Sequence, residues 1–449
     1  MSFPTFKLEF TKDGSVHDET QVDEILKNID QFSDLLVISH GWNNDMQEAQ
    51  KLYDDLGNSI EKILQIVEKG ENLKELKELK QRKFGVVHVF WPSKRFADKD
   101  LIPGGGAASA TQASDDALIR LLEALKCDPE RLPEKAVDSK PDLERAAILA
   151  RVQAVIPRLE TDQDAQREYV LELRKLFVSP SGDVDDGTDE LFTQDPVKLF
   201  DSLKEPVKAP VGSRKGGATS ISDAGGAAGL GDLVASAKAA ARRIANLFTY
   251  STMKERAGTV GREGLSPVLV RLRGRKEKLK LHLVGHSFGG RLVTAAADAL
   301  LPGTPDVSLT LLQAAYSHNG LSKNFDDEGN NGAFRSLIAD KRASGPVVIT
   351  HTHNDKAVGI AYPLASRISR DQASALGDKD DPYGGMGRNG AQHTPEAEGK
   401  GGDMHGVGKP YDFQRGSVYN LKADDFIDDH GDVTGFEVAY ALLHAVKAV

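Results

Sequence analysis

The 449-residue chain contains a single cysteine, Cys127, so it cannot form an intrachain disulfide and does not depend on an oxidising compartment. It also lacks any run approaching the roughly 18 consecutive apolar residues that would predict a membrane span. Its first residues lack the basic and apolar regions of a secretory signal peptide. These absences predict a cytoplasmic protein and leave export without a cleavable signal open.

An excess of basic residues is also missing. The formal net charge is −10, which disfavours a general nucleic-acid-binding protein. One basic run, Arg271–Lys280, is interpreted as a solvated helix end and turn, with phosphate or acidic-partner binding as the less favoured alternative. Hydrophobic residues make up 39% of the chain and charged residues 28%, values typical of a soluble globular protein.

Short apolar runs alternate with amphipathic segments in the first and last parts of the chain. The runs predict buried strands, and several of them are followed in the chain by segments with helical periodicity. The predicted strands are Phe6–Phe10, Asp34–Ser39, Gly85–Trp91, Leu279–Val284, Val307–Gln313, Pro346–Thr350 and Ser417–Leu421. This alternation predicts an α/β fold with a mostly parallel central sheet flanked by helices on both faces.

Residues 103–232 interrupt the alternation and contain no obvious buried strand. Glycine-rich stretches stand at both ends, and amphipathic helices are predicted between them over 115–125, 142–155 and 163–177. We therefore predict a helical insertion with glycine-rich hinges. This prediction divides the chain into a first core part at 1–102, the insertion at 103–232 and a second core part at 233–449.

One motif carries chemistry with a clear structural context. Gly285-His286-Ser287-Phe288-Gly289 has the pattern G-x-S-x-G and lies between a predicted buried strand and a predicted helix. The two glycines permit the strained turn that displays the serine hydroxyl. The free N–H groups of the helix start then point beside it. Ser287 is therefore a candidate nucleophile, and an ordinary turn serine is the alternative.

A serine nucleophile needs a base, an orienting carboxylate and an oxyanion hole. Asp355 follows the predicted strand ending near Thr350, and His430 follows the one ending near Leu421. Because the carboxyl ends of parallel strands meet at one edge of a sheet, we expect these groups to gather there. Alternatives remain for two of the roles: His393, His405 and His444 for the base, and Asp298 for the acid.

The serine motif, the early His40-Gly41-Trp42 and the chain order Ser287, Asp355, His430 resemble the α/β-hydrolase superfamily. The resemblance covers roughly residues 6–98 and 240–449. It implies an α/β-hydrolase fold in which Ser287 is the nucleophile, His430 the base and Asp355 the acid.

The resemblance has two further implications. The oxyanion hole would consist of the backbone N–H groups of Trp42 and Phe288. The insertion at 103–232 would serve as a cap or lid, which is where this family often carries one. The ring of Trp42 is a packing candidate, and His40 is interpreted as a histidine that braces its loop.

These features predict a serine hydrolase that cleaves carboxylic esters, esterase-like or lipase-like, through an acyl-enzyme and without a cofactor. Tyr316 and His318 are candidate substrate contacts, and the expected partner is a small-molecule or lipid ester. A peptidase or amidase, an acyltransferase, a lipolytic effector and a non-catalytic binding module remain alternatives. No metal site is expected, because the acidic clusters at 378–381 and 424–432 match no calcium-loop spacing and no Cys/His pattern suggests zinc.

Overall fold

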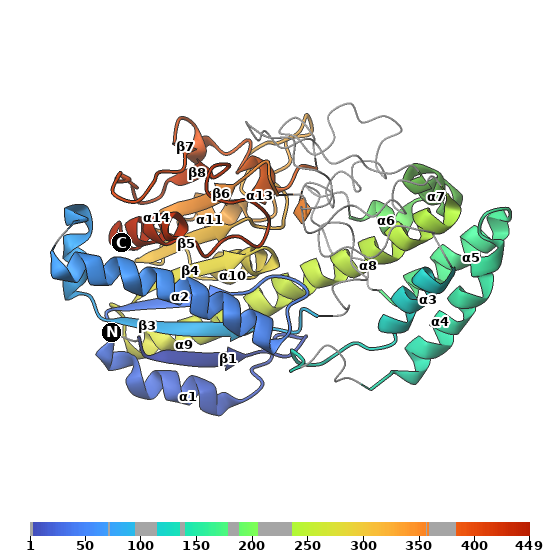
Figure 1. The fold of residues 1–449 in the computed structure, drawn as a ribbon, viewed down its shortest axis with the longest axis horizontal. Coiled ribbons are helices and arrows are strands. Elements are labelled where there is room, and N and C mark those ends of the chain that lie inside the picture. The colour runs from blue at the N-terminus through green and yellow to red at the C-terminus, as the bar shows by residue number, and fades with distance from the viewer. Residues whose placement is uncertain are drawn as a thin grey trace.

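A single eight-stranded sheet forms the centre of the molecule (Figure 1). The computed structural model describes residues 3–70, 72–94, 115–134, 140–177, 188–204, 236–355, 357–358 and 383–449. The strand order is β1-β3-β2-β4-β5-β6-β8-β7, and every pair of neighbours is parallel. The strands are β1 (Thr5–Glu9), β2 (Asp34–Ser39), β3 (Phe84–Phe90), β4 (Lys280–His286), β5 (Val307–Leu312), β6 (Val347–His351), β7 (Gly401–Asp403) and β8 (Val418–Lys422).

Helices cover both faces of this sheet (Figure 1). One face packs against α1, the C-terminal part of α8, α9 and α10, and the other packs against α2 and α14. These helices are α1 (Glu19–Asn28), α2 (Met46–Lys69), α8 (Ala237–Thr259), α9 (Ser266–Arg275), α10 (Phe288–Asp298) and α14 (Phe436–Lys447). Short helices α11 (Arg335–Ala339) and α13 (Met386–Asn389) lie in later loops.

The apolar runs of the sequence are strands that are buried on two sides. In β2, Leu35 and Val37 point into the core under α1 and α10, and Leu36 and Ile38 point into the core under α2 and α14. Successive side chains of a strand alternate between faces, so a strand covered on both sides needs apolar residues at every position. The sheet confirms the predicted α/β class with helices on both faces.

The strand order, however, is not the one typical of α/β-hydrolase sheets. The structure therefore shows an α/β fold with an all-parallel sheet, and the family remains a prediction. Within the described residues, no helix is both long and apolar enough to cross a membrane.

In the described part of the predicted insertion, five α-helices form a unit with its own apolar core at one end of the molecule (Figure 1). They are α3 (Asp115–Ala124), α4 (Leu143–Val155), α5 (Gln163–Arg174), α6 (Glu190–Thr193) and α7 (Pro196–Lys204). The N-terminal half of α8 completes this core, while its C-terminal half joins the core of the sheet. The predicted boundaries at 103 and 232 and the glycine-rich hinges lie outside the described residues.

Some elements differ from the expectations. Helix α1 and strand β7 were not predicted, and a 3-10 helix lies at Lys74–Gln81, before β3. The chain is helical from Ala237 to Arg275, because a π-helix at Val260–Leu265 joins α8 to α9. Glycine permits the π-helix to approach α10 closely there, since a Cβ on Gly261 would lie 2.3 Å from the Leu292 carbonyl oxygen.

Residues of the basic run Arg271–Lys280 form ion pairs and hydrogen bonds with α1 and with the turn that follows it. Arg271 forms an ion pair with Glu19 at 2.8 Å, and Arg275 pairs with Asp30. The Lys276 ammonium donates to the Asp30 carbonyl oxygen at 3.1 Å. These charges therefore contribute to the packing of α9 against α1 and the turn that follows it.

Two glycines within helices, Gly57 and Gly261, provide a matched test of how closely the helices pack around them. Gly57, within α2, has no atom within 4 Å of the position that a Cβ would take. We expect Gly57→Ala to raise the free energy of unfolding by about 0.5–1 kcal/mol, because alanine loses less backbone entropy. Gly261→Ala should lower it by about 1–3 kcal/mol through overpacking. Urea unfolding measures both, and equal stabilisation by the two substitutions would contradict the packing at Gly261.

Candidate active site

Ser287 lies at the sharp turn between β4 and α10, with φ 56° and ψ −125°. This conformation is rare for a residue with a side chain. It exists here because the neighbouring backbones touch. A Cβ on Gly285 would lie 2.3 Å from the Gly289 carbonyl oxygen, and a Cβ on Gly289 would lie 2.3 Å from that of Ser39. Only glycine fits at either position, so the turn displays the serine from a rigid support.

A chain of two hydrogen bonds joins Ser287 to an imidazole and a carboxylate. His430 Nε2 lies 2.9 Å from Ser287 Oγ, and His430 Nδ1 lies 2.8 Å from Asp355 Oδ2. A carboxylate can only accept, so Nδ1 carries the proton and Nε2 accepts from the serine hydroxyl. The structure thus brings together all three residues that the sequence analysis selected, in the order that proton transfer from the serine requires.

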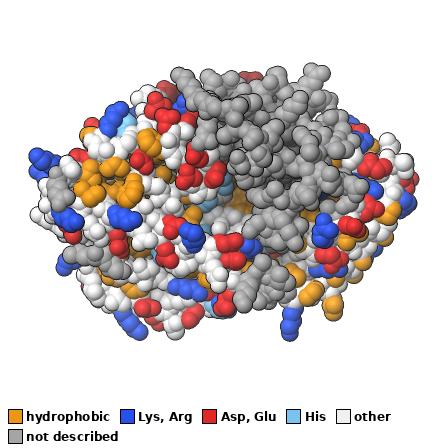
Figure 2. Space-filling view, viewed as in Figure 1, with side chains coloured by type: hydrophobic (Ala, Val, Ile, Leu, Met, Phe, Trp, Pro, Cys, Tyr) orange, Lys and Arg blue, Asp and Glu red, His pale blue; other side chains and the backbone are white. Residues whose placement is uncertain are grey.

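The parallel sheet explains this convergence. Ser287 follows β4, Asp355 follows β6 and His430 follows β8, and these strands lie near one another in the sheet. All three side chains therefore stand at the carboxyl edge. The Ser287 residue is 5% exposed and the His430 side chain 23%, whereas Asp355 is fully buried. Histidine side chains are visible near the middle of the face in Figure 2.

The pKa of His430 lies above its ordinary value. Burial lowers this pKa, but the charge of Asp355, the hydrogen bond to Asp355 and the charge of Asp429 together raise it by a larger amount. A histidine with a raised pKa is a stronger base when it is deprotonated. His430 is therefore suited to accept a proton from a hydroxyl.

The other candidate bases have different surroundings. His393 Nδ1 lies 2.9 Å from the side-chain oxygen of Asn319. The ring of His405 stacks on Tyr411. His444 is buried within α14, and burial lowers its pKa to about 4. The structure brings none of them to Ser287.

Asp298, the alternative acid, stands at the end of α10. Its carboxylate accepts a hydrogen bond from the Ser336 hydroxyl, and burial raises its pKa. Asp355 instead follows β6, and its second oxygen accepts from the backbone N–H of Val358 at 2.9 Å. The carboxylate that meets His430 is thus held in place by the backbone at its own turn.

The loop after β2 touches the serine directly. A Cβ on Gly41 would lie 2.6 Å from Ser287 Cβ and 3.2 Å from Ser287 Oγ. Among the described residues, neither the Trp42 nor the Phe288 backbone N–H has a hydrogen-bond partner. Phe288 opens α10, where N–H groups have no partner within the helix. The oxyanion role of these two N–H groups stays a prediction, and neither is engaged by another described residue.

The side chains of this loop contribute to packing. The Trp91 indole N–H donates to the His40 carbonyl oxygen at 3.0 Å, and the Trp91 backbone N–H donates to His40 Nε2 at 3.3 Å. Burial lowers the pKa of His40 to about 4. The Trp42 ring contacts the rings of Tyr250 and Phe288, with centroids 5.8 and 6.0 Å apart. His40 thus braces its loop, as the sequence analysis interpreted it.

Tyr316 and His318, the predicted substrate contacts, are buried residues with protein partners. The Tyr316 hydroxyl lies 3.1 Å from that of Thr294, and its ring packs edge-on against Phe334. His318 Nδ1 lies 3.2 Å from the side-chain amide of Asn389. Their contact with a substrate stays a prediction.

The acidic residues near the site have hydrogen-bond partners of their own. Asp424 accepts from the Thr352 hydroxyl and the His353 backbone N–H, both at 2.9 Å. Asp429 accepts from the Gly431 and Asp432 backbone N–H groups at 2.8 and 3.1 Å. No group of three or more His, Cys, Asp or Glu in the described part of the chain could hold a metal ion. The cluster at 378–381 lies outside the described residues.

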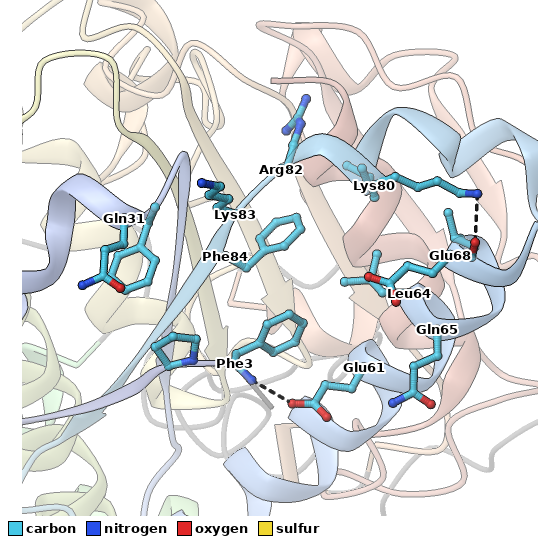
Figure 3. A pocket seen from close by; sticks show the side chains of 14 residues that line it. Phe3, Gln31, Glu61, Leu64, Gln65, Glu68, Lys80, Arg82, Lys83 and Phe84 are labelled. Carbon is cyan, nitrogen blue, oxygen red and sulfur yellow. Dashed lines mark hydrogen bonds between the residues drawn. The ribbon is translucent and has the colours of Figure 1, made fainter. Parts of the chain in front are cut away.

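A separate pocket of about 270 Å³ lies at the opposite edge of the sheet (Figure 3). Phe3 and Phe84 line it near the amino end of β3, together with Arg82. The Arg82 guanidinium already pairs with Asp34 at 3.0 Å and donates to the Val446 carbonyl oxygen at 2.8 Å. This pocket is therefore not part of the site around Ser287.

No protein-family model, curated protein or solved structure significantly matches the chain.

One residue of the site was not predicted from the sequence. His286, directly before the serine, places Nε2 at 2.8 Å from the His430 carbonyl oxygen. His286 occupies a variable position of the G-x-S-x-G motif. Residue spacing cannot predict its hydrogen bond to a carbonyl group 144 residues away.

The raised pKa of His430 can be measured directly. NMR titration of the ring resonances should give a midpoint above the ordinary 6.5. Asp429→Asn should move this midpoint to lower pH, because it removes one negative charge that favours the protonated ring. A midpoint below 6.5 in the unchanged protein would contradict the proposed balance between burial and the two carboxylates.

Proposed function

We propose that the protein is a serine hydrolase of the α/β-hydrolase type that cleaves carboxylic esters. One observation carries the proposal: Ser287 Oγ, His430 and Asp355 form a continuous hydrogen-bonded chain, with distances of 2.9 and 2.8 Å, at the carboxyl edge of the sheet. The turn at Ser287 and the chain order of the three residues support the family, although the strand order of the sheet is not the typical one.

In the proposed reaction Ser287 Oγ attacks the acyl carbon while its proton moves to His430 Nε2. Asp355 holds the Nδ1 proton and stabilises the imidazolium that forms. The imidazolium then protonates the departing alkoxide, so that the alcohol leaves and an acyl-serine remains. Water attacks this acyl group with His430 again as base, which releases the carboxylic acid and restores the serine.

The negative charge that develops on the acyl oxygen would be stabilised by the backbone N–H groups of Trp42 and Phe288. Gly41 brings the loop after β2 against Ser287, and Phe288 begins the helix after it. Each such donor is worth about 3–4 kcal/mol in enzymes that use one. No step of this scheme requires a cofactor.

The helical unit around α3–α7 would be the cap of this site. Helix α8 belongs to the core of that unit with its N-terminal half and to the core of the sheet with its C-terminal half. Trp42 packs against both cores and touches Tyr250 of α8. The residue that would supply an oxyanion donor thus lies where the helical unit meets the sheet.

Labelling with a fluorophosphonate probe tests the proposal. We expect a single adduct on Ser287, found by intact mass and peptide mapping, and no adduct on Ser287→Ala. Ester hydrolysis should fall by at least about 10³-fold in the same variant, because triad members act as a unit. Near-normal turnover by Ser287→Ala would contradict the mechanism. Transfer of the acyl group to an added alcohol or amine in preference to water would favour an acyltransferase instead.

Asp355→Asn provides a second and independent test. The amide keeps the shape of the carboxylate but presents an N–H donor that disfavours the productive tautomer of His430. We expect kcat to fall by about 10⁴-fold with KM changed little. Asp298→Asn is the matched control and should retain activity within about twofold, because the Asp298 carboxylate binds Ser336 at the far end of α10. The reverse ranking of the two variants would reassign the acid.

A further inference from the structure

We infer that His286 positions the catalytic base by holding the backbone of His430, an inference that rests on the proposed function. His286 Nε2 lies 2.8 Å from the His430 carbonyl oxygen, and the two rings lie 4.9 Å apart. His286 is the last residue of β4 and stands next to the nucleophile. The same turn therefore contacts His430 at two points, through Ser287 Oγ at the ring and through His286 at the main chain.

The protonation of His286 follows from its partner. A carbonyl oxygen can only accept, so Nε2 carries the proton and Nδ1 does not. Nδ1 is buried and has no hydrogen-bond partner among the described residues, and a Cβ on Gly41 would lie 3.2 Å from it. Burial, with the charge of His430, lowers the pKa of His286 to about 3. The ring is therefore a neutral donor at any pH at which the triad operates.

His430 needs such support because it lies outside any helix or strand. It is in the segment between β8 and α14, whose backbone is held by short turn hydrogen bonds and by a few side chains. The Asn354 amide donates to the carbonyl oxygens of Asp424 and Ile427 at 3.0 and 2.9 Å, before the base. In the described part of the chain, His286 makes the one side-chain hydrogen bond to the backbone of His430 itself.

The bond should affect catalysis more than binding. Asp355 and Ser287 fix the tilt of the imidazole, but both contact ring atoms, and the ring can follow its own backbone away from them. A displacement of about 1 Å in such a constellation costs on the order of 10²-fold in rate. His286 is buried and offers little surface to a substrate, so KM should depend little on it.

Three variants test the inference. His286→Leu replaces the imidazole with an apolar side chain of similar size and removes the donor. His286→Gln can place its amide nitrogen near the position of Nε2 and restore the bond. His444→Leu is the matched control, because it removes another buried histidine that lies within α14 and outside the triad. For each we would measure kcat and KM with an ester, the rate of fluorophosphonate labelling, and hydrogen exchange of peptides covering 423–435.

We expect His286→Leu to lower kcat and the labelling rate by about 10–100-fold, with KM within about twofold and faster exchange in 423–435 alone. His286→Gln should recover most of the rate, and His444→Leu should match the unchanged protein. A His286→Leu variant with normal kcat and normal exchange would overturn the inference. So would an equally slow Gln variant, since it would show that the ring and not the donor is required.

These outcomes are distinguishable from failure of the proposed function. If the unchanged protein neither takes the probe nor hydrolyses esters, the hydrolase proposal fails. Exchange in 423–435 then decides separately whether His286 holds this segment, because that measurement needs no activity. Unchanged exchange in His286→Leu would overturn the positioning role in that case as well.

Discussion

The site depends on the close contact of backbones at three glycines. Gly285 and Gly289 pack against one another across the turn, and Gly41 packs against Ser287 itself. A side chain at any of these positions would separate the strand end, the helix start and the loop after β2. Their contact holds Ser287 at a positive φ whose conformational cost is about 1–3 kcal/mol. The surrounding core, not the turn, supplies the free energy that maintains this geometry.

The all-parallel sheet brings the other residues of the site to the turn at Ser287. Each strand delivers its following loop to the same edge, so residues separated by more than 140 positions meet within hydrogen-bond distance. The rigid support is shared, since Ser287 and His286 belong to one turn and both contact His430. The nucleophile and the base are therefore positioned relative to each other by a common element rather than by two independent loops.

Sequence patterns predicted those features that depend on local rules. The apolar run at Asp34–Ser39 is a strand with the predicted bounds, because burial on two faces demands an unbroken run. Ser287, Asp355 and His430 could be chosen because each follows a strand. Contacts between distant segments could not be predicted in this way. Gly261 allows the π-helix to approach α10 closely, a contact that the sequence around it does not reveal. The hydrogen bond from His286 to the His430 carbonyl oxygen depends on the path of the loop that carries His430.

A crystal structure of the protein with a phosphonate bound covalently to Ser287 would test the central claim most directly, because the phosphonyl group imitates the tetrahedral intermediate. We predict that the phosphonyl oxygen lies about 2.7–3.1 Å from the backbone nitrogens of both Trp42 and Phe288. We also predict that His430 Nε2 keeps its position beside Oγ. An oxygen held by other donors, or an adduct on a different residue, would contradict the account.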